Sequence, residues 1–296
     1  MSGLSKDLGK KLVLTAEVAP PRGPDVSAFA KELAEIKKVG KDISAVNVVD
    51  LPSAMLLMNS FAGCLMVQKA GLEPIYQLTC RDRNMLALQS DLLAASAFSI
   101  DNVLSISGDH PSVPLGDHPN AKPVYDLDSS SLIKAMSSLN MGVDIMGQKI
   151  NKKTNFFIGA AIGPGATPID GEIYKTKRKF EAGADFFQTQ AVFEPSPVSK
   201  FLDKFEKTFG QDIRKKVLVG VVLIHSVGMA KFLSHMPGLN LPAEVISKME
   251  KAKDKVGAGV EIASEVIEDL KTLDVGGIHL MPAGKTDVLV RLLESL

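Results

Sequence analysis

Eight short apolar runs, each followed by a longer helix-compatible stretch, constrain the fold of this 296-residue chain more than any other feature. The runs are rich in β-branched residues, and they begin near Leu12, Ile43, Pro74, Asn102, Asn155, Ala184, Val217 and Val275. Their start-to-start intervals are 31, 31, 28, 53, 29, 33 and 58 residues, and five of these fit one strand plus one helix. This alternation predicts parallel strands joined by helical crossovers.

The two long intervals predict insertions rather than further strands. The stretch from Asp109 to Asp128 is rich in Pro, Gly and Asp, and the last interval has room for more than one helix, with a break around Pro237-Gly238 and Pro242. Apolar residues recur at steps of three or four in two of the expected helices: Phe29, Leu33, Ile36 and Val39, and Ile262, Val266 and Leu270. Such stripes indicate helices that pack on a core.

Eight strand–helix units match a closed (β/α)8 TIM barrel, for which about 250 residues is typical. The runs are nearly all apolar, as expected when helices cover one face of a strand and the barrel interior covers the other. An open doubly wound sheet is the main alternative. Against it, the first run leads into Pro20-Pro21-Arg22-Gly23-Pro24 and lacks the G-x-G-x-x-G turn of dinucleotide-binding sheets. We therefore predict one (β/α)8 barrel domain over residues 1–296.

Charge and cysteine content narrow the function classes. Lys plus Arg and Asp plus Glu each number 34, so no net charge attracts the chain to nucleic acid or to an anionic membrane. Two cysteines, Cys64 and Cys80, are too few for a disulfide framework or a cysteine-only metal centre, and they predict a reducing compartment. The sequence shows no targeting segment and no apolar run near the roughly 20 residues that cross a bilayer. We expect a cytoplasmic protein without membrane insertion or a nucleic-acid partner.

Polar residues close several of the apolar runs. In a parallel barrel the carboxyl ends of the strands form one mouth, and active sites lie there. The polar residues at these ends are Thr15, Glu17, Asn47, Gln77, Thr79, Ser107, Asp109, Gln188, Thr189, Gln190, His225 and Ser226. One acid, a second carboxylate and several amides are therefore expected to share the mouth.

Glu17 is the first candidate for catalysis, because desolvation at the end of an apolar strand can raise the pKa of a carboxyl group and make it a general acid. A plain ion pair with Arg22 or Lys179 is the alternative. Asp109 follows a glycine, where the backbone can approach a ligand, or it could simply cap a turn. Gln190 could offer a donor and an acceptor to a heteroaromatic edge, or be a buried structural amide.

Other polar motifs are weaker. The repeat of Gly108-Asp109-His110-Pro111 in Gly116-Asp117-His118-Pro119 suggests a metal site, but the prolines favour a turn-rich loop, and we predict no metal. His235 and His279 are interpreted as packed or surface residues, since neither adjoins a Ser or Cys nucleophile motif. Lys177-Arg178-Lys179 is either a solvated helix face or a phosphate-binding group at the barrel rim.

Six motifs span nearly the whole chain: Thr15–Pro21 (TAEVAPP), Gln77–Cys80 (QLTC), Leu104–Asp109 (LSISGD), Val124–Asp128 (VYDLD), Lys177–Asp185 (KRKFEAGAD) and Gln188–Phe193 (QTQAVF). In combined order and spacing they resemble methylenetetrahydrofolate reductase, the flavoprotein family that reduces 5,10-methylenetetrahydrofolate to 5-methyltetrahydrofolate. The resemblance is closest to bacterial branches in which the reductase is fused to, or partnered with, another protein.

The resemblance implies a flavin, with FAD favoured over FMN, held across the barrel mouth with the folate pterin stacked on it. By that similarity Glu17 would be the general acid that opens the methylene bridge of the folate substrate. Asp109 would lie near the flavin and the pterin, and Gln190 would contact the pterin. The flavin contacts that it implies are Asn47, Gln77, Ser107, Gly108, Asp109, Tyr125, Asp126, Glu172 and Lys179. Lys179 would then be a phosphate partner.

Three positions depart from the family pattern. Ser107 stands where the family commonly has Arg, Gln77 stands where His is frequent, and Val227 replaces a phenylalanine that stacks on folate or nicotinamide. The first two changes predict a weaker charged hold on the cofactor. Loss of the aromatic residue predicts poor direct use of NAD(P)H. We expect electrons to come from a partner, an iron–sulfur or zinc-containing subunit, within an oligomer or hetero-complex.

Two alternatives stay open at this point. A pterin-binding methyltransferase barrel would pass a methyl group to a corrinoid protein or a thiol. A non-catalytic barrel subunit would only dock a redox partner, although such a surface needs none of Glu17, Asp109 and Gln190.

Overall fold

Eight parallel strands close into a barrel in which strands adjacent in sequence are also adjacent in space. The computed structural model describes residues 2–236 and 238–295. The strands are β1 (Val13–Val18), β2 (Ile43–Val48), β3 (Pro74–Thr79), β4 (Asn102–Ile106), β5 (Phe157–Ile162), β6 (Phe186–Ala191), β7 (Val217–Val222) and β8 (Gly277–Met281). Each begins within two residues of the start expected from the sequence. The predicted (β/α)8 barrel is confirmed, and the open doubly wound sheet is wrong.

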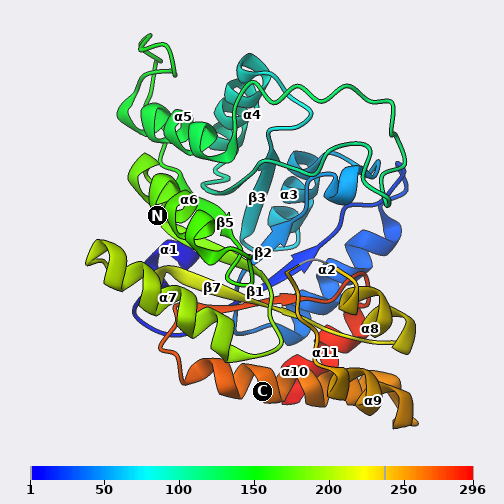
Figure 1. Cartoon of the computed structure of the whole chain (residues 1–296). Coiled ribbons are helices and arrows are strands. Elements are labelled where there is room, and N and C mark those ends of the chain that lie inside the picture. Colours follow the sequence, from blue (N-terminus) through cyan, green and yellow to red (C-terminus); the bar gives the residue numbers. More distant parts are fainter. Residues whose placement is uncertain (1, 237, 296) are drawn as a thin grey trace.

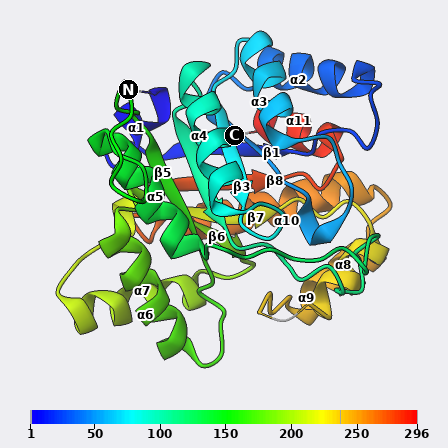
Figure 2. The ribbon, with the colours of Figure 1, turned by 90° about the horizontal axis from the view of Figure 1, so that it is seen from above.

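The helices surround the strands (Figures 1 and 2). They are α1 (Gly3–Asp7), α2 (Ser27–Val39), α3 (Ser60–Lys69), α4 (Met85–Ala97), α5 (Ser129–Met141), α6 (Ile169–Ala182), α7 (Pro195–Phe209), α8 (Val227–Ser234), α9 (Ala243–Lys251), α10 (Lys255–Lys271) and α11 (Thr286–Ser295), with 3-10 turns η1 (Pro52–Ala54) and η2 (Arg214–Lys216). Within the described residues, no helix is long and apolar enough to cross a bilayer.

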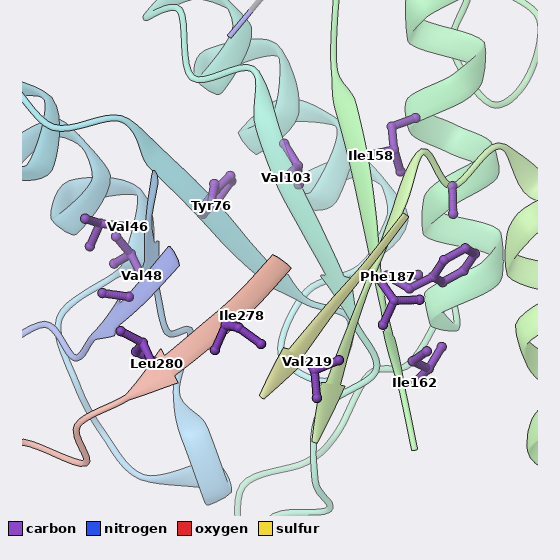
Figure 3. Close-up of a cluster of buried hydrophobic side chains, with 14 of the residues drawn as sticks. Val46, Val48, Tyr76, Val103, Ile158, Ile162, Phe187, Val219, Ile278 and Leu280 are labelled. Carbon is purple, nitrogen blue, oxygen red and sulfur yellow. The ribbon is translucent and has the colours of Figure 1, made fainter. Parts of the chain in front are cut away.

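One face of each strand packs against the helices. Among the strand residues on this face are Val46, Val48, Tyr76, Val103, Ile158, Ile162, Phe187, Val219, Ile278 and Leu280 (Figure 3). Most of the two predicted helix stripes faces the same core, since Phe29 and Leu33 of α2 and Val266 and Leu270 of α10 are buried with it. Ile262 of α10 is buried in a second cluster, with α8 and α9. Burial of both strand faces explains why the runs read as almost continuously apolar.

The barrel interior begins with an apolar layer at the amino ends of the strands. It comprises Leu4, Val13, Ala45, Ile75, Leu104, Phe186 and Leu218. Leu4 comes from α1, which therefore supplies part of this layer from outside the barrel strands. Phe186 stacks on Phe157 with ring centroids 5.1 Å apart, and Gly159 makes room for it, because a Cβ atom there would lie 2.3 Å from the Phe186 ring.

A polar layer lies two residues further along the strands. Because side chains alternate with a period of two, the residues that follow the apolar layer at that spacing also face the interior. They include Thr15, Asn47, Gln77, Gln188 and His279, all of them buried. One further step along β1 brings Glu17 to the mouth.

Both predicted insertions are confirmed as connections rather than strands. The β4–α5 loop runs from the α4–α5 side to the opposite side of the barrel (Figure 1), where Asp117 pairs with Arg22 and accepts a hydrogen bond from the Leu56 amide. In the second insertion α8 ends at Ser234 and α9 begins at Ala243. Pro237 lies outside the described residues, and Gly238 beside it has a positive φ of 82°.

Candidate functional site

Glu17 lies at the mouth with its side chain about one-quarter exposed, at 25%. Its Oε2 atom is 3.5 Å from Gln77 Nε2 and 3.6 Å from His279 Nε2. The two ion pairs considered as alternatives do not form, because Arg22 pairs with Asp117 and the Lys179 ammonium donates to the Ala161 carbonyl. Glu17 is therefore open to the mouth on one side and contacts polar interior groups on the other.

His279 is packed, as one of its two sequence interpretations had it, but its position makes it part of the site. It is wholly buried, its Nδ1 lies 2.9 Å from Thr15 Oγ1, and its Nε2 has no hydrogen-bond partner among the described residues. Sequence reasoning missed it by looking for an adjacent nucleophile. The available signal was a lone polar residue inside the apolar run Gly277–Met281.

Asn47 and Gln188 join opposite walls of the barrel. Asn47 Nδ2 donates to Gln188 Oε1 at 2.9 Å, and Asn47 is also the register partner of Glu17 on the neighbouring strand. The other side-chain atom of Asn47, Oδ1, is buried and has no partner within the described part of the chain. Asn47 was expected to contact a flavin, whereas here its amide group spans the barrel interior.

Gly108 forms a tight turn at the end of β4. It has a φ of 88°, and a Cβ atom there would lie 2.4 Å from Thr79 Cγ2. The Tyr125 hydroxyl donates to the Gly108 carbonyl at 3.1 Å, and Ser107 Oγ accepts a hydrogen bond from the Ser129 amide at 3.3 Å. The backbone at this turn therefore packs directly against Thr79, and hydrogen bonds hold it from two directions.

Arg81 is a functional candidate that the sequence reasoning missed. Its side chain is 2% exposed and forms a bidentate pair with Asp82. It also donates to the carbonyls of Asp109, at 3.1 Å, and Leu51, at 3.0 Å. Although position 107 is Ser, a buried guanidinium thus reaches the Gly108–Asp109 turn from the end of β3. The prediction that Ser107, in place of an arginine, weakens the charged contacts to the cofactor did not take Arg81 into account.

The β2–α3 loop beside Arg81 is strained. Leu51, Ser53 and Ala54 all have positive φ angles between 47° and 56°, a region that few residues other than glycine adopt. A cavity of about 170 Å³ lies between this loop and the β4–α5 loop. Its lining comprises Leu51, Ala54, Met55, Leu56, Arg81, Asp82, Pro111, His118 and Ala121. Clustered strain beside a cavity is typical of a ligand-binding loop.

Helix α6 brings two predicted residues to the end of β5. The Lys179 ammonium donates to the Ala161 carbonyl at 2.6 Å, and burial lowers the pKa of this amine. Glu172 Oε1 accepts a hydrogen bond from the Gly163 amide at 3.1 Å. Arg178, by contrast, pairs with Asp128 on the outside of the barrel. Within the Lys177–Lys179 cluster, Arg178 thus lies on a solvated helix face, whereas the Lys179 ammonium reaches the end of β5. A phosphate contact of Lys179 stays a prediction.

The remaining predicted residues are spread over the mouth. The Asp126 carboxylate accepts a hydrogen bond from the Met85 amide at the start of α4. The side chains of Asp109 and Gln190 are exposed at the ends of β4 and β6. In the two Gly-Asp-His-Pro repeats, His118 pairs with Asp117 and His110 contacts Ser112. Among the described residues, no group of three or more His, Cys, Asp or Glu side chains is arranged to hold a metal ion.

Sequence comparison gives matches along the whole chain. Methylenetetrahydrofolate reductase is the family that matches, over residues 4–296. Methylenetetrahydrofolate reductase 2 of Schizosaccharomyces pombe is 24% identical over 219 residues, and the probable methylenetetrahydrofolate reductase (NADPH) of Caenorhabditis elegans is 23% identical over 241 residues. These matches cover 68% and 78% of this chain but 32% and 33% of the relatives. The chain therefore spans about a third of their length.

Comparison with solved structures supports the same architecture. One similar structure is described as an uncharacterized protein from Clostridium thermocellum that binds two copies of 5-methyl-5,6,7,8-tetrahydrofolic acid. It superposes with a TM-score of 0.69 over 99% of this chain and 98% of that one, at 14% sequence identity. Because only 14% of the residues are identical, this similarity shows a shared barrel fold and no more.

Proposed function

The chain belongs to the methylenetetrahydrofolate reductase family, and on that premise we propose that it reduces 5,10-methylenetetrahydrofolate to 5-methyltetrahydrofolate with a bound flavin, FAD in preference to FMN. The observation that carries the proposal is the carboxyl group of Glu17, which stands at the barrel mouth and contacts Gln77 and His279 on its inner side. A carboxyl in that position can transfer a proton to a substrate at the mouth.

The residues at the β3–β4 corner fit a flavin. Gly108 packs so closely against Thr79 and Arg81 that only a glycine fits there, and this keeps the turn in the position proposed for the cofactor. Beside it lie the buried guanidinium of Arg81 and the hydroxyl of Tyr125. Lys179 would offer its ammonium to the phosphate of the cofactor from the β5 side of the mouth. When bound, the flavin would supply the hydride that reduces the methylene carbon.

The chain itself would supply orientation and a proton. We infer that Glu17 donates its proton to the folate amine nitrogen as the methylene bridge opens. The exposed amide of Gln190 would give the pterin edge one donor and one acceptor. Asp109, fixed through its carbonyl by Arg81, would present its carboxylate to the same substrate. These groups come from three strands, so the reaction needs the assembled barrel.

Replacing Glu17 tests the acid role. The Glu17→Gln variant is expected to bind flavin normally and to slow folate reduction by about 10²- to 10⁴-fold, because an amide keeps the shape of the side chain but cannot donate an acidic proton. Single-turnover mixing of the reduced protein with 5,10-methylenetetrahydrofolate measures this step. Glu294→Gln, at an exposed glutamate near the end of α11, is the matched control. Near-normal reduction by the Glu17→Gln protein would refute the proposed role.

We further propose that the electrons arrive from the iron–sulfur clusters of a partner protein; a zinc ion in such a partner would be structural, since Zn²⁺ has no redox chemistry. Val227 begins α8, where an aromatic side chain would otherwise stack on nicotinamide. The lost stacking contributes on the order of 0.5 to 1.5 kcal/mol, so free NAD(P)H should reduce the flavin slowly. Anaerobic stopped-flow mixing with NADH, NADPH and reduced ferredoxin-like donors tests this. Rapid flavin bleaching by a pyridine nucleotide alone would contradict it.

An absorption spectrum separates the reductase from the methyltransferase alternative. The reductase is expected to carry a yellow, extractable flavin after purification or after reconstitution with FAD. A colourless protein that resists reconstitution and still binds methyltetrahydrofolate would instead support a methyl-transfer barrel.

A further inference from the structure

The position of His279 is unusual for a core histidine. Nothing of its side chain is exposed, yet Nε2 is left without a hydrogen-bond partner among the described residues. Leaving a buried polar group unpaired destabilises the fold. The atom lies 3.6 Å from Glu17 Oε2, just beyond hydrogen-bonding distance. A small rotation of the partly exposed Glu17 side chain would close the gap.

We propose that His279 is the positioning residue for Glu17: Nε2 hydrogen-bonds the carboxyl group and Thr15 orients the imidazole ring. The inference rests on the proposed role of Glu17 and adds to it the contact that aims its carboxyl group at the mouth.

The contact with Thr15 decides which nitrogen carries the proton. If Nδ1–H donates to Thr15 Oγ1, which lies 2.9 Å away, then neutral His279 has a free lone pair at Nε2. That lone pair can accept the O–H of a protonated Glu17 once the carboxyl group has rotated towards it. The contact would leave both imidazole nitrogens paired.

The strands that flank His279 present uncharged groups to its ring. Its register partners are Thr15 of β1 and Gly220 of β7. The other polar side chains of this layer, Asn47, Gln77 and Gln188, are also uncharged. Among the described residues, Glu17 is the charged side chain that lies within ion-pair distance of the imidazole. A pH effect that depends on His279 is therefore expected to act through Glu17.

The experiment compares pH profiles of the folate step in flavin-loaded variants. His279→Leu removes the acceptor, His279→Gln offers a carbonyl oxygen near the place of Nε2, and Thr15→Val removes the orienting contact. Thr176→Val is the matched control, since Thr176 on α6 is also fully buried with an unpartnered hydroxyl among the described residues. Reduced protein is mixed with 5,10-methylenetetrahydrofolate from pH 6 to pH 9, and flavin reduction by dithionite is recorded in parallel.

The expected signature is an altered pH profile that the conservative variant partly restores. Without its partner the Glu17 carboxyl group is no longer held towards the mouth, so the pH profile of the folate step should change in His279→Leu and change less in His279→Gln. The rate at neutral pH should drop about 10- to 100-fold in His279→Leu. Thr176→Val should keep the wild-type profile, and dithionite reduction should be unchanged throughout.

A His279→Leu protein that keeps the wild-type pH profile, while Glu17→Gln is slow, would overturn the inference about His279. The acid role of Glu17 would then stay intact. If His279→Leu does not fold, Thr15→Val decides, and an unchanged pH profile there counts against the proposal. Normal reduction by Glu17→Gln would instead remove the proposed function itself.

Discussion

The two layers inside the barrel lie two residues apart on the same strands and differ in almost every physical respect. The inner layer is apolar, close-packed and covered by Leu4 from α1. The outer layer carries amides, a hydroxyl and an imidazole, and two of its atoms, Asn47 Oδ1 and His279 Nε2, are buried without partners among the described residues. Of these two layers, the one that holds side-chain atoms without partners is thus the layer next to the mouth, which is where barrel enzymes place their chemistry.

Strand β6 contributes to both layers and makes the comparison testable on one element. Phe186 fills the apolar layer against Phe157 and Gly159, and Gln188, two residues later, pairs with Asn47 in the polar layer. Substitutions at these two positions should therefore separate stability from function.

The largest expected effect is on stability in the apolar layer. Phe186→Ala should lower the free energy of unfolding by about 3–5 kcal/mol, because it leaves a cavity that the closed barrel cannot collapse around. Urea unfolding followed by circular dichroism measures the loss. Phe98→Ala, at an exposed phenylalanine that follows α4, is the control. A loss below about 1 kcal/mol would show that the apolar layer is not the stabilising one.

The polar layer should respond in two stages. Gln188→Met leaves Asn47 Nδ2 unpaired and should cost about 1–3 kcal/mol of stability. Adding Asn47→Leu removes both partners, so the double variant should recover most of that loss. Folate reduction should stay impaired in the double variant, as a single-turnover assay would reveal. If activity returned together with stability, this layer would be structural only.

A smaller effect is expected at the Gly108 turn. Gly108→Ala places a side chain in the left-handed region, at a cost of about 1–2 kcal/mol, and drives it against Thr79 and Arg81. Flavin titration should show weaker binding. Gly147→Ala is the matched control, since Gly147 has a similar φ of 82° with no atom within 4 Å of the added Cβ. Equal flavin affinity in the two variants would argue against a cofactor contact at the Gly108 turn.

The most gradual effect is a pH dependence of the free energy of unfolding, which arises from two cysteines in the core between the strands and the helices. Burial raises the pKa of the Cys80 thiol from 9.0 to about 12, and it also raises that of Cys64. Above pH 9 the unfolded thiols ionise while the folded ones stay neutral, so stability should fall as pH rises towards 12, by up to about 1.4 kcal/mol per pH unit for each group. Unfolding at pH 8 to 10.5 tests this.

A Cys64→Ala/Cys80→Ala double variant provides the comparison for that pH series. Its stability should fall less steeply above pH 9 than that of the unchanged chain. Identical slopes would show that the thiols are not the cause, and Tyr76, whose buried hydroxyl also has a raised pKa, would be tested next.

Much of the mouth could be predicted because strand ends are encoded locally. An apolar run that ends in a polar residue shows where a strand leaves the sheet, so Glu17 and Gly108 were placed at the mouth from sequence alone. Gln77, also expected there, lies one step deeper, in the polar layer. Partners could not be predicted in the same way. Arg81 directly follows the Gln77–Cys80 motif and was not included in it. Nothing in the neighbouring sequence indicates that its guanidinium binds the carbonyl of Asp109.

The sequence by itself determined the eight strands, their order and the end of the barrel at which polar groups gather, because alternation and apolar length are properties of neighbouring residues. The tertiary structure alone decided which polar groups meet. Thr15 and His279 are 264 positions apart and Asn47 and Gln188 are 141 apart, and each pair forms only when the strands close into a barrel. A buried polar side chain is defined by the partner that satisfies it, and here that partner lies across or around the barrel rather than along the chain.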